Sequence, residues 1–180
     1  MSSLEVILLV VVIFLAAGVL WLLVARRRSQ HLRSRFGPEY HRTVTELGDR
    51  RKAERDLERR EKHVQRLHIR PLDPSDRDLF VKAWQEDQSR FVDDPEGAVV
   101  EADRLVTEVM GKRGYPVSDF EQRVDDVSVD HPHLVENYRT ARDIVLRHKQ
   151  GKADTEDLRR ALVCYRALFD ELLEAQEVRR

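Results

Sequence analysis

The chain begins with a continuous run of apolar residues. The segment VILLVVVIFLAAGVLWLLVA, residues 6–25, is 20 residues long and contains no charge and no proline. A helix of that length spans about 30 Å, the thickness of the hydrocarbon core of a bilayer. A cleaved signal peptide would place positive residues before a shorter apolar core, whereas MSSLE precedes this run. The pattern therefore predicts a retained transmembrane helix that contacts the lipid bilayer.

A highly charged segment with few apolar positions follows this run. Gly37 interrupts the helical pattern and Pro38 suits a first helical position, so we expect a helix from Pro38 to about His68. Between residues 48 and 66, 13 of 19 residues are charged, and i,i+4 pairs such as Arg50–Glu54 support an exposed helix. The thin apolar stripe consists of Tyr40, Val44, Leu47, Leu57, Val64 and Leu67. The segment is predicted to be a helical stalk, either a solvated spacer or a weak coiled coil through which two chains associate.

From Pro71 onward, apolar residues recur at the three- and four-residue spacings typical of helix bundles. Helix starts are marked by Asp73–Pro74, by Asp94–Pro95 and by a capping box of Ser118 and Glu121. The expected helices are 75–92, 95–112, 132–149 and 155–175, with a short one near 119–127. No stretch alternates as a strand would.

The predicted fold class is therefore all-α: a transmembrane anchor (1–25), a basic juxtamembrane segment and charged helical stalk (26–70), and an acidic bundle of about four to five helices (71–180).

The net charge of −1 conceals two oppositely charged parts. Residues 26–70 contain 15 Lys or Arg against 7 Asp or Glu, and residues 71–180 contain 17 against 25. Because no Lys or Arg precedes the apolar run, the positive-inside rule places the N-terminus outside and the rest of the chain in the cytoplasm. The stalk is rich in acids and poor in aromatics, so lipid explains its basicity better than nucleic acid does. The predicted lipid-headgroup residues are Arg26, Arg27, Arg28, Arg33 and Arg35.

The stretch SVDHPHLVENY, residues 128–138, carries the strongest candidate chemistry. Asp130, His131, His133 and Glu136 include metal-ligating and acid–base side chains. A zinc site needs three or four converging ligands, and two histidines two apart across a proline are not a helical i,i+4 pair. The same stretch resembles a helix start with Pro132 in the first turn, which is the interpretation we favour.

Other catalytic signals are weak. Cys164 lies within an apolar helical stripe, where a buried thiol is expected, and a single cysteine forms no intramolecular disulfide. The sequence contains no glycine-rich phosphate loop and no GxSxG motif, and nothing indicates a cofactor.

Several short segments together resemble a family of uncharacterised bacterial membrane-anchored proteins. They are RFGPEY, GDRRKAE, IRPL, FVDDPEGAVVEADRLVTEVM, RGYP and SVDHP, and they extend from about Arg35 to the C-terminus. The resemblance implies a protein of the bacterial inner membrane and carries no activity, substrate or cofactor.

The expected function is a membrane-tethered cytoplasmic interaction or scaffold module with a protein partner, for which Phe91 and Tyr115 are candidate contacts. The alternative is a metal-binding or acid–base enzyme that uses Asp130, His131, His133 and Glu136.

Overall fold

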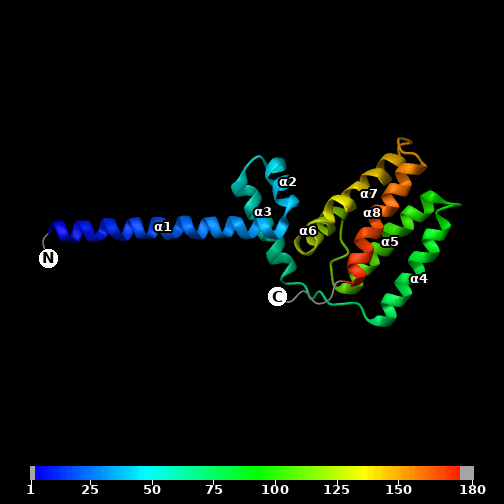
Figure 1. Ribbon diagram of the computed structural model, residues 1–180, viewed down its shortest axis with the longest axis horizontal. Coiled ribbons are helices and arrows are strands. Elements are labelled where there is room, and N and C mark those ends of the chain that lie inside the picture. The colour runs from blue at the N-terminus through cyan, green and yellow to red at the C-terminus, as the bar shows by residue number, and fades with distance from the viewer. Residues whose placement is uncertain (1–2, 175–180) are drawn as a thin grey trace. The chain divides into compact units, whose positions relative to one another are not determined.

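The computed structural model describes residues 3–174, with side chains described from Val12 onward. Most of these residues are helical and none of them forms a strand, which confirms the all-α class (Figure 1). The chain divides into two compact units, residues 1–58 and residues 59–180. The helices are α1 (Ser3–Phe36), α2 (Pro38–Leu47), α3 (Arg50–Val64), α4 (Pro74–Arg90), α5 (Pro95–Arg113), α6 (Phe120–Asp130), α7 (Val135–His148) and α8 (Thr155–Glu174).

Helix α1 continues without interruption through the apolar run and the arginines to Phe36. Its large apolar side chains from Val12 to Val24 are between 49% and 73% exposed, so this stretch contacts little else in the chain. Among the described residues, no helix is both long enough and apolar enough to cross a membrane. Residues 6–11 of the predicted span lie outside the described side chains.

The predicted stalk is two helices, not one. The interruption at Gly37, with Pro38 opening α2, is confirmed. The chain breaks again at Gly48, which adopts the left-handed conformation (φ 62°). Asp49 then opens α3, since its Oδ1 accepts from the backbone N–H groups of Arg51 and Lys52 at 2.7 and 3.1 Å. The prediction of one continuous helix from Pro38 to about His68 is wrong, and so is a coiled-coil seam that runs straight through it.

The thin apolar stripe is packed in part, although Leu47 remains 45% exposed. Tyr40 and Leu57 are buried, and so are Leu32 and Phe36 of α1. The Tyr40 hydroxyl donates to Glu54 Oε1 at 2.8 Å, which ties α2 to α3. The first unit is therefore a small helical assembly at the C-terminal end of α1.

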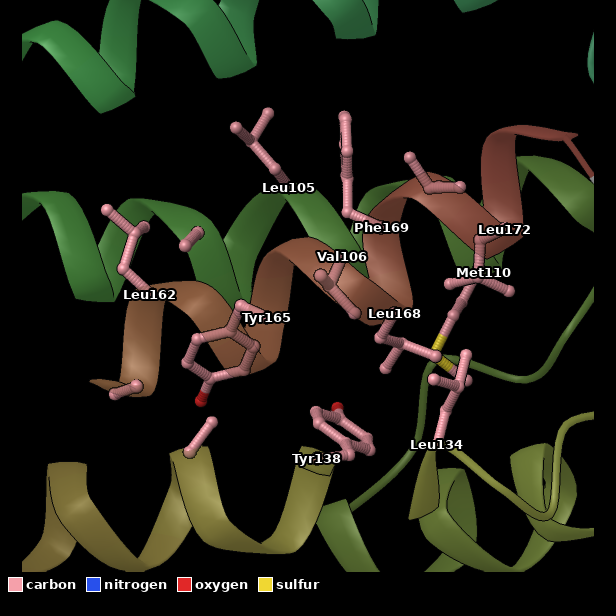
Figure 2. Packing of buried hydrophobic residues seen from close by; sticks show 14 of the residues in the cluster. Leu105, Val106, Met110, Leu134, Tyr138, Leu162, Tyr165, Leu168, Phe169 and Leu172 are labelled. Atoms are coloured by element: carbon pink, nitrogen blue, oxygen red, sulfur yellow. The ribbon is translucent and has the colours of Figure 1, made fainter. Parts of the chain in front are cut away.

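The second unit is a helix bundle centred on α8, which packs against both α5 and α7, while α4 covers α5 and α6 packs against α7. Its buried interior is formed mainly by aliphatic and aromatic side chains, as Figure 2 shows for Leu168 and Phe169 of α8 with Met110 of α5. Trp84 of α4 stacks on Phe169, with ring centroids 4.4 Å apart. Burying each such side chain stabilises the fold by about 1.5–3 kcal/mol.

The predicted bundle helices are present, one of them with a later start than predicted, and two of the start signals are confirmed. Asp73 and Asp94 are the N-cap residues of α4 and α5, each followed by proline, and Asp94 Oδ1 accepts from Gly97 N–H at 2.9 Å. The third start lies one residue later than the predicted Ser118 box. Asp119 caps α6, and its Oδ1 accepts from Gln122 N–H at 3.0 Å.

The stretch around Pro132 is the end of one helix, not the start of the next. Helix α6 runs to Asp130, and His131 is its C-cap, with its N–H donating to Val127 O at 2.8 Å. A residue before proline is driven out of the α region, and His131 has φ −130° and ψ 55°. Helix α7 begins only at Val135, so the predicted helix start at Pro132 is wrong.

Candidate functional site at the end of α6

The four predicted metal or acid–base residues do not converge. Asp130 and His131 lie at the end of α6, whereas His133 is exposed in the following turn and Glu136 is exposed on α7. Across the part of the chain that the structure describes, no group of three or more His, Cys, Asp or Glu side chains is placed to hold a metal ion. The fold instead brings Asp130 and His131 together with residues that are distant in the sequence.

Tyr115 is the first of these partners. Its hydroxyl donates to Asp130 Oδ2 at 3.1 Å, and its side chain is only 3% exposed. Burial, and then the negative charge of Asp130, raise the pKa of Tyr115, so the hydroxyl stays protonated and acts as a donor. Tyr115 is thus an internal residue of the bundle and does not face a partner as the sequence suggested.

His131 is bound to the central helix α8. Its ring is buried, and Nδ1 lies 3.2 Å from Oε1 of Glu171. Burial lowers the pKa of His131, and the nearby Glu171 carboxylate opposes this shift only in part. The ring is therefore neutral near pH 7 and donates its Nδ1–H to the carboxylate. Glu171 is 40 residues away, and no local motif in the sequence could have pointed to it.

Asp126, one turn before Asp130, is fully buried. Its Oδ1 accepts from Gln122 Nε2 at 2.9 Å and lies 3.5 Å from His63 Nε2 at the end of α3. Burial raises the pKa of this carboxyl, while Gln122 and His63 act in the opposite direction. Beside it, Arg60 Nη1 pairs with Asp125 Oδ1 at 2.8 Å. The C-terminal turns of α3 are thus held against α6 by the Arg60–Asp125 ion pair, with His63 lying beside Asp126.

Arg113, the last residue of α5, completes the site. Although charged, it is only 1% exposed. Its Nη1 donates to the carbonyl of Leu172 at 3.0 Å, and its Nε donates to the carbonyl of Arg70 at 3.3 Å. The carbonyl of Arg113 accepts from Arg70 N–H at 2.9 Å. This one side chain therefore satisfies a carbonyl near the end of α8 and fixes the segment before α4.

Taken together, the site joins the end of α3, the Arg70 segment, α5, α6 and α8. Its central acid–base groups, Asp126 and His131, are buried and bonded to neighbouring side chains, so the arrangement is suited to fixing helix ends in position.

Other side chains singled out from the sequence lie apart from this site. Cys164 is half-buried on α8, and burial raises the pKa of its thiol, which makes the reactive thiolate scarcer. Phe91 is half-buried against the bundle interior, next to Val92, whose side chain is 84% exposed.

The five arginines after the apolar run have different environments. Arg26 and Arg27 are exposed, whereas Arg28 pairs with Glu58. The guanidinium of Arg33 lies over the ring of Tyr40, 5.2 Å from its centroid, and Arg35 is half-buried.

Sequence reasoning missed a buried carboxylate on α4. Asp87 is 1% exposed, and neither of its carboxylate oxygens has a hydrogen-bond partner among the described residues. Desolvation raises its pKa to about 6. An aspartate within a helix pattern carries no sequence signal for such burial.

No protein family, curated protein sequence or solved structure matches this chain. The resemblance to bacterial membrane-anchored proteins stays a prediction.

Proposed function

We propose that the protein is a membrane-tethered helical interaction module whose bundle lies in the cytoplasm. The observation that carries the proposal is the surface of α1. From Val12 to Val24 its large apolar side chains are exposed on all sides of the helix, and three arginines follow directly after Ala25. A helix that is apolar all round is stable when it is surrounded by an apolar medium, which a bilayer supplies.

The direction of insertion rests on the same arginines. Lys and Arg accumulate on the cytoplasmic side of a span, and here they occur only after it. The residues before the apolar run would then lie outside the cytoplasm, and the residues after Arg26 would lie inside it. Tethering raises the concentration of the bundle near the bilayer without any chemical step.

The partner is proposed to be a protein that binds the corner between α4 and α5. Val92 is the most exposed of the large apolar side chains described in the bundle, and it adjoins the half-buried Phe91. Aromatic and apolar side chains are enriched in the fully buried core of protein interfaces, and Phe91 and Val92 would supply them at this corner.

The anchor is tested by fractionating cells that express the full chain with a reporter at its C-terminus. The chain should stay in the membrane fraction after a high-salt wash, and the reporter should behave as cytoplasmic. The paired change Leu15→Arg and Leu20→Arg should release it, because the arginine at position 15, in the middle of the span, costs about 2.5–3.5 kcal/mol and the second adds to that cost. Release of the unaltered chain by salt, or a periplasmic reporter, would refute the proposal.

A matched control is the paired change Val100→Arg and Val163→Arg. These are also exposed apolar positions, 53% and 54% exposed, but they lie on the bundle. This variant should stay in the membrane.

The partner surface is tested by placing a photocrosslinking amino acid at Val92 in the full chain. A discrete crosslinked protein should appear, and it should be absent when the same group is placed at Val163. Identical crosslinking patterns from both positions would argue against a surface centred on Val92.

A further inference from the structure

Helix α3 crosses α1 instead of running along it. Arg50 Nη2 donates to Ser29 Oγ at 2.5 Å, and the guanidinium of Arg28 pairs with Glu58. Arg50 and Glu58 are about 12 Å apart along α3, whereas Arg28 and Ser29 are consecutive on α1. Two points far apart on α3 therefore meet one point on α1, and Figure 1 shows the two ribbons crossing there.

The crossing point lies just beyond the apolar run. Ser29 is four residues after Ala25, which places it about 6 Å further along the α1 axis. The headgroup layer extends about 5–8 Å beyond the hydrocarbon core on each side. With residues 6–25 in the hydrocarbon core, α3 would lie at the level of the lipid headgroups.

The acidic residues of α3 in the first unit are engaged within the protein. Glu54 accepts from Tyr40 and Arg50, and Glu58 pairs with Arg28. Asp56 is half-buried and also has a partner within the chain. Asp49 accepts from backbone N–H groups at the helix start, and the backbone bonds lower its pKa. These contacts neutralise the negative charge locally.

The basic residues on the opposite side of α3 are exposed. Ala53 and Leu57 define its buried face, while Arg51, Lys52 and Arg55 lie on the solvent side. On α1, Arg26 and Arg27 are exposed as well. The first unit therefore presents two sets of exposed cations near one level of α1.

We infer that α3 is an interfacial helix that binds anionic phospholipid headgroups through Arg51, Lys52 and Arg55, together with Arg26 and Arg27. The inference rests on the proposed anchor, which places α3 at the headgroups. Juxtamembrane clusters of basic residues bind anionic lipid by electrostatic attraction, and each residue near the surface contributes. The sequence had assigned lipid contact only to the arginines of residues 26–35, two of which are occupied by Glu58 and Tyr40.

The test uses the full chain in nanodiscs of phosphatidylcholine alone and of an equal mixture with phosphatidylglycerol. Hydrogen exchange of the α3 amides is measured in both. Exchange should be about tenfold slower in the anionic discs, since several cations contribute to binding. High salt should remove the difference.

The paired change Lys52→Gln and Arg55→Gln should abolish most of this lipid dependence. The matched pair Lys82→Gln and Arg77→Gln removes the same two charges from exposed positions on α4 and should leave it intact. Circular dichroism of both variants should equal that of the unaltered chain. Equal α3 exchange in neutral and anionic discs, or equal effects of the two pairs, would overturn the inference while leaving the anchor standing. A chain that enters neither kind of disc would overturn both.

Discussion

Gly114 occupies a position where even one methyl group should be destabilising. It ends α5 with φ 98°, a conformation that is unfavourable for any residue with a Cβ. A Cβ built there would lie 2.4 Å from the backbone oxygen of His68, well inside contact distance. Gly114→Ala must therefore strain its own backbone and also displace the segment around His68.

The magnitude follows from what that segment holds. Arg70 N–H donates to the Arg113 carbonyl, and the Arg70 carbonyl accepts from the buried Arg113 side chain. Strain at positive φ costs about 1–2 kcal/mol, and loss of these two bonds adds about 2–3 kcal/mol because one involves a charged group. Gly114→Ala should lower the free energy of unfolding by about 3–5 kcal/mol.

The assay is urea unfolding of the full chain in detergent, followed by tryptophan fluorescence. The chain has two tryptophans, Trp21 and Trp84, so a Trp21→Phe background makes the signal report on the second unit alone. The control is Gly151→Ala. Gly151 also has a positive φ, of 70°, but a Cβ there meets nothing within 4 Å.

Gly151→Ala should lower the free energy of unfolding by only about 1–2 kcal/mol, the cost of backbone strain alone. If Gly114→Ala costs no more than Gly151→Ala, the contact with His68 does not restrict this site, and the reasoning about the Arg70 segment fails.

Three further outcomes are expected from the same unfolding assay. Leu168→Ala should cost about 2–5 kcal/mol, because the side chain is fully buried; a smaller loss would show a loosely packed interior. Asp87→Asn should stabilise the protein by about 1–3 kcal/mol near pH 7 and much less near pH 4. Because the native pKa, about 6, exceeds the ordinary value of 3.8, the native state holds this proton more tightly, and stability falls as pH rises between those values. A stabilisation that is equal at both pH values would contradict this. The losses in free energy of unfolding caused by His131→Ala and by Glu171→Ala should not add up in the double variant. The coupling energy should be about 0.5–1 kcal/mol, because Glu171 is partly exposed. Strict additivity would mean that the contact is not formed.

Features that depend on neighbouring residues were predictable from the sequence. The Asp73–Pro74 and Asp94–Pro95 starts need only a local cap and a proline, and the apolar spacings of the bundle reflect one face of each helix. Prediction failed where two local signals compete. At Gly48, attractive charge pairs favoured a continuous helix, but glycine followed by a capping Asp49 ended one helix and began another.

The prediction of the candidate site was wrong for a different reason. Pro132 affects the residues on both sides of it, and the sequence does not show whether it begins a helix or ends the previous one. Here the preceding helix extends to Asp130, and His131 is turned toward Glu171. The contacts of Asp126 with His63, and of Arg113 with Leu172, join segments 59 to 63 residues apart. Such pairings are set by how the helices pack, which no local spacing encodes.

The guanidinium of Arg113 donates to the backbone carbonyls of both Arg70 and Leu172. The segment before α4 and the end of α8 therefore lie close enough together for one side chain to contact both. Chains whose terminal segments lie close together tolerate circular permutation. A short linker could join these two segments, and new termini could be opened in the exposed turn at Gln150–Gly151 between α7 and α8. The bundle could then be attached to another protein through α7 or α8, with its internal packing unchanged.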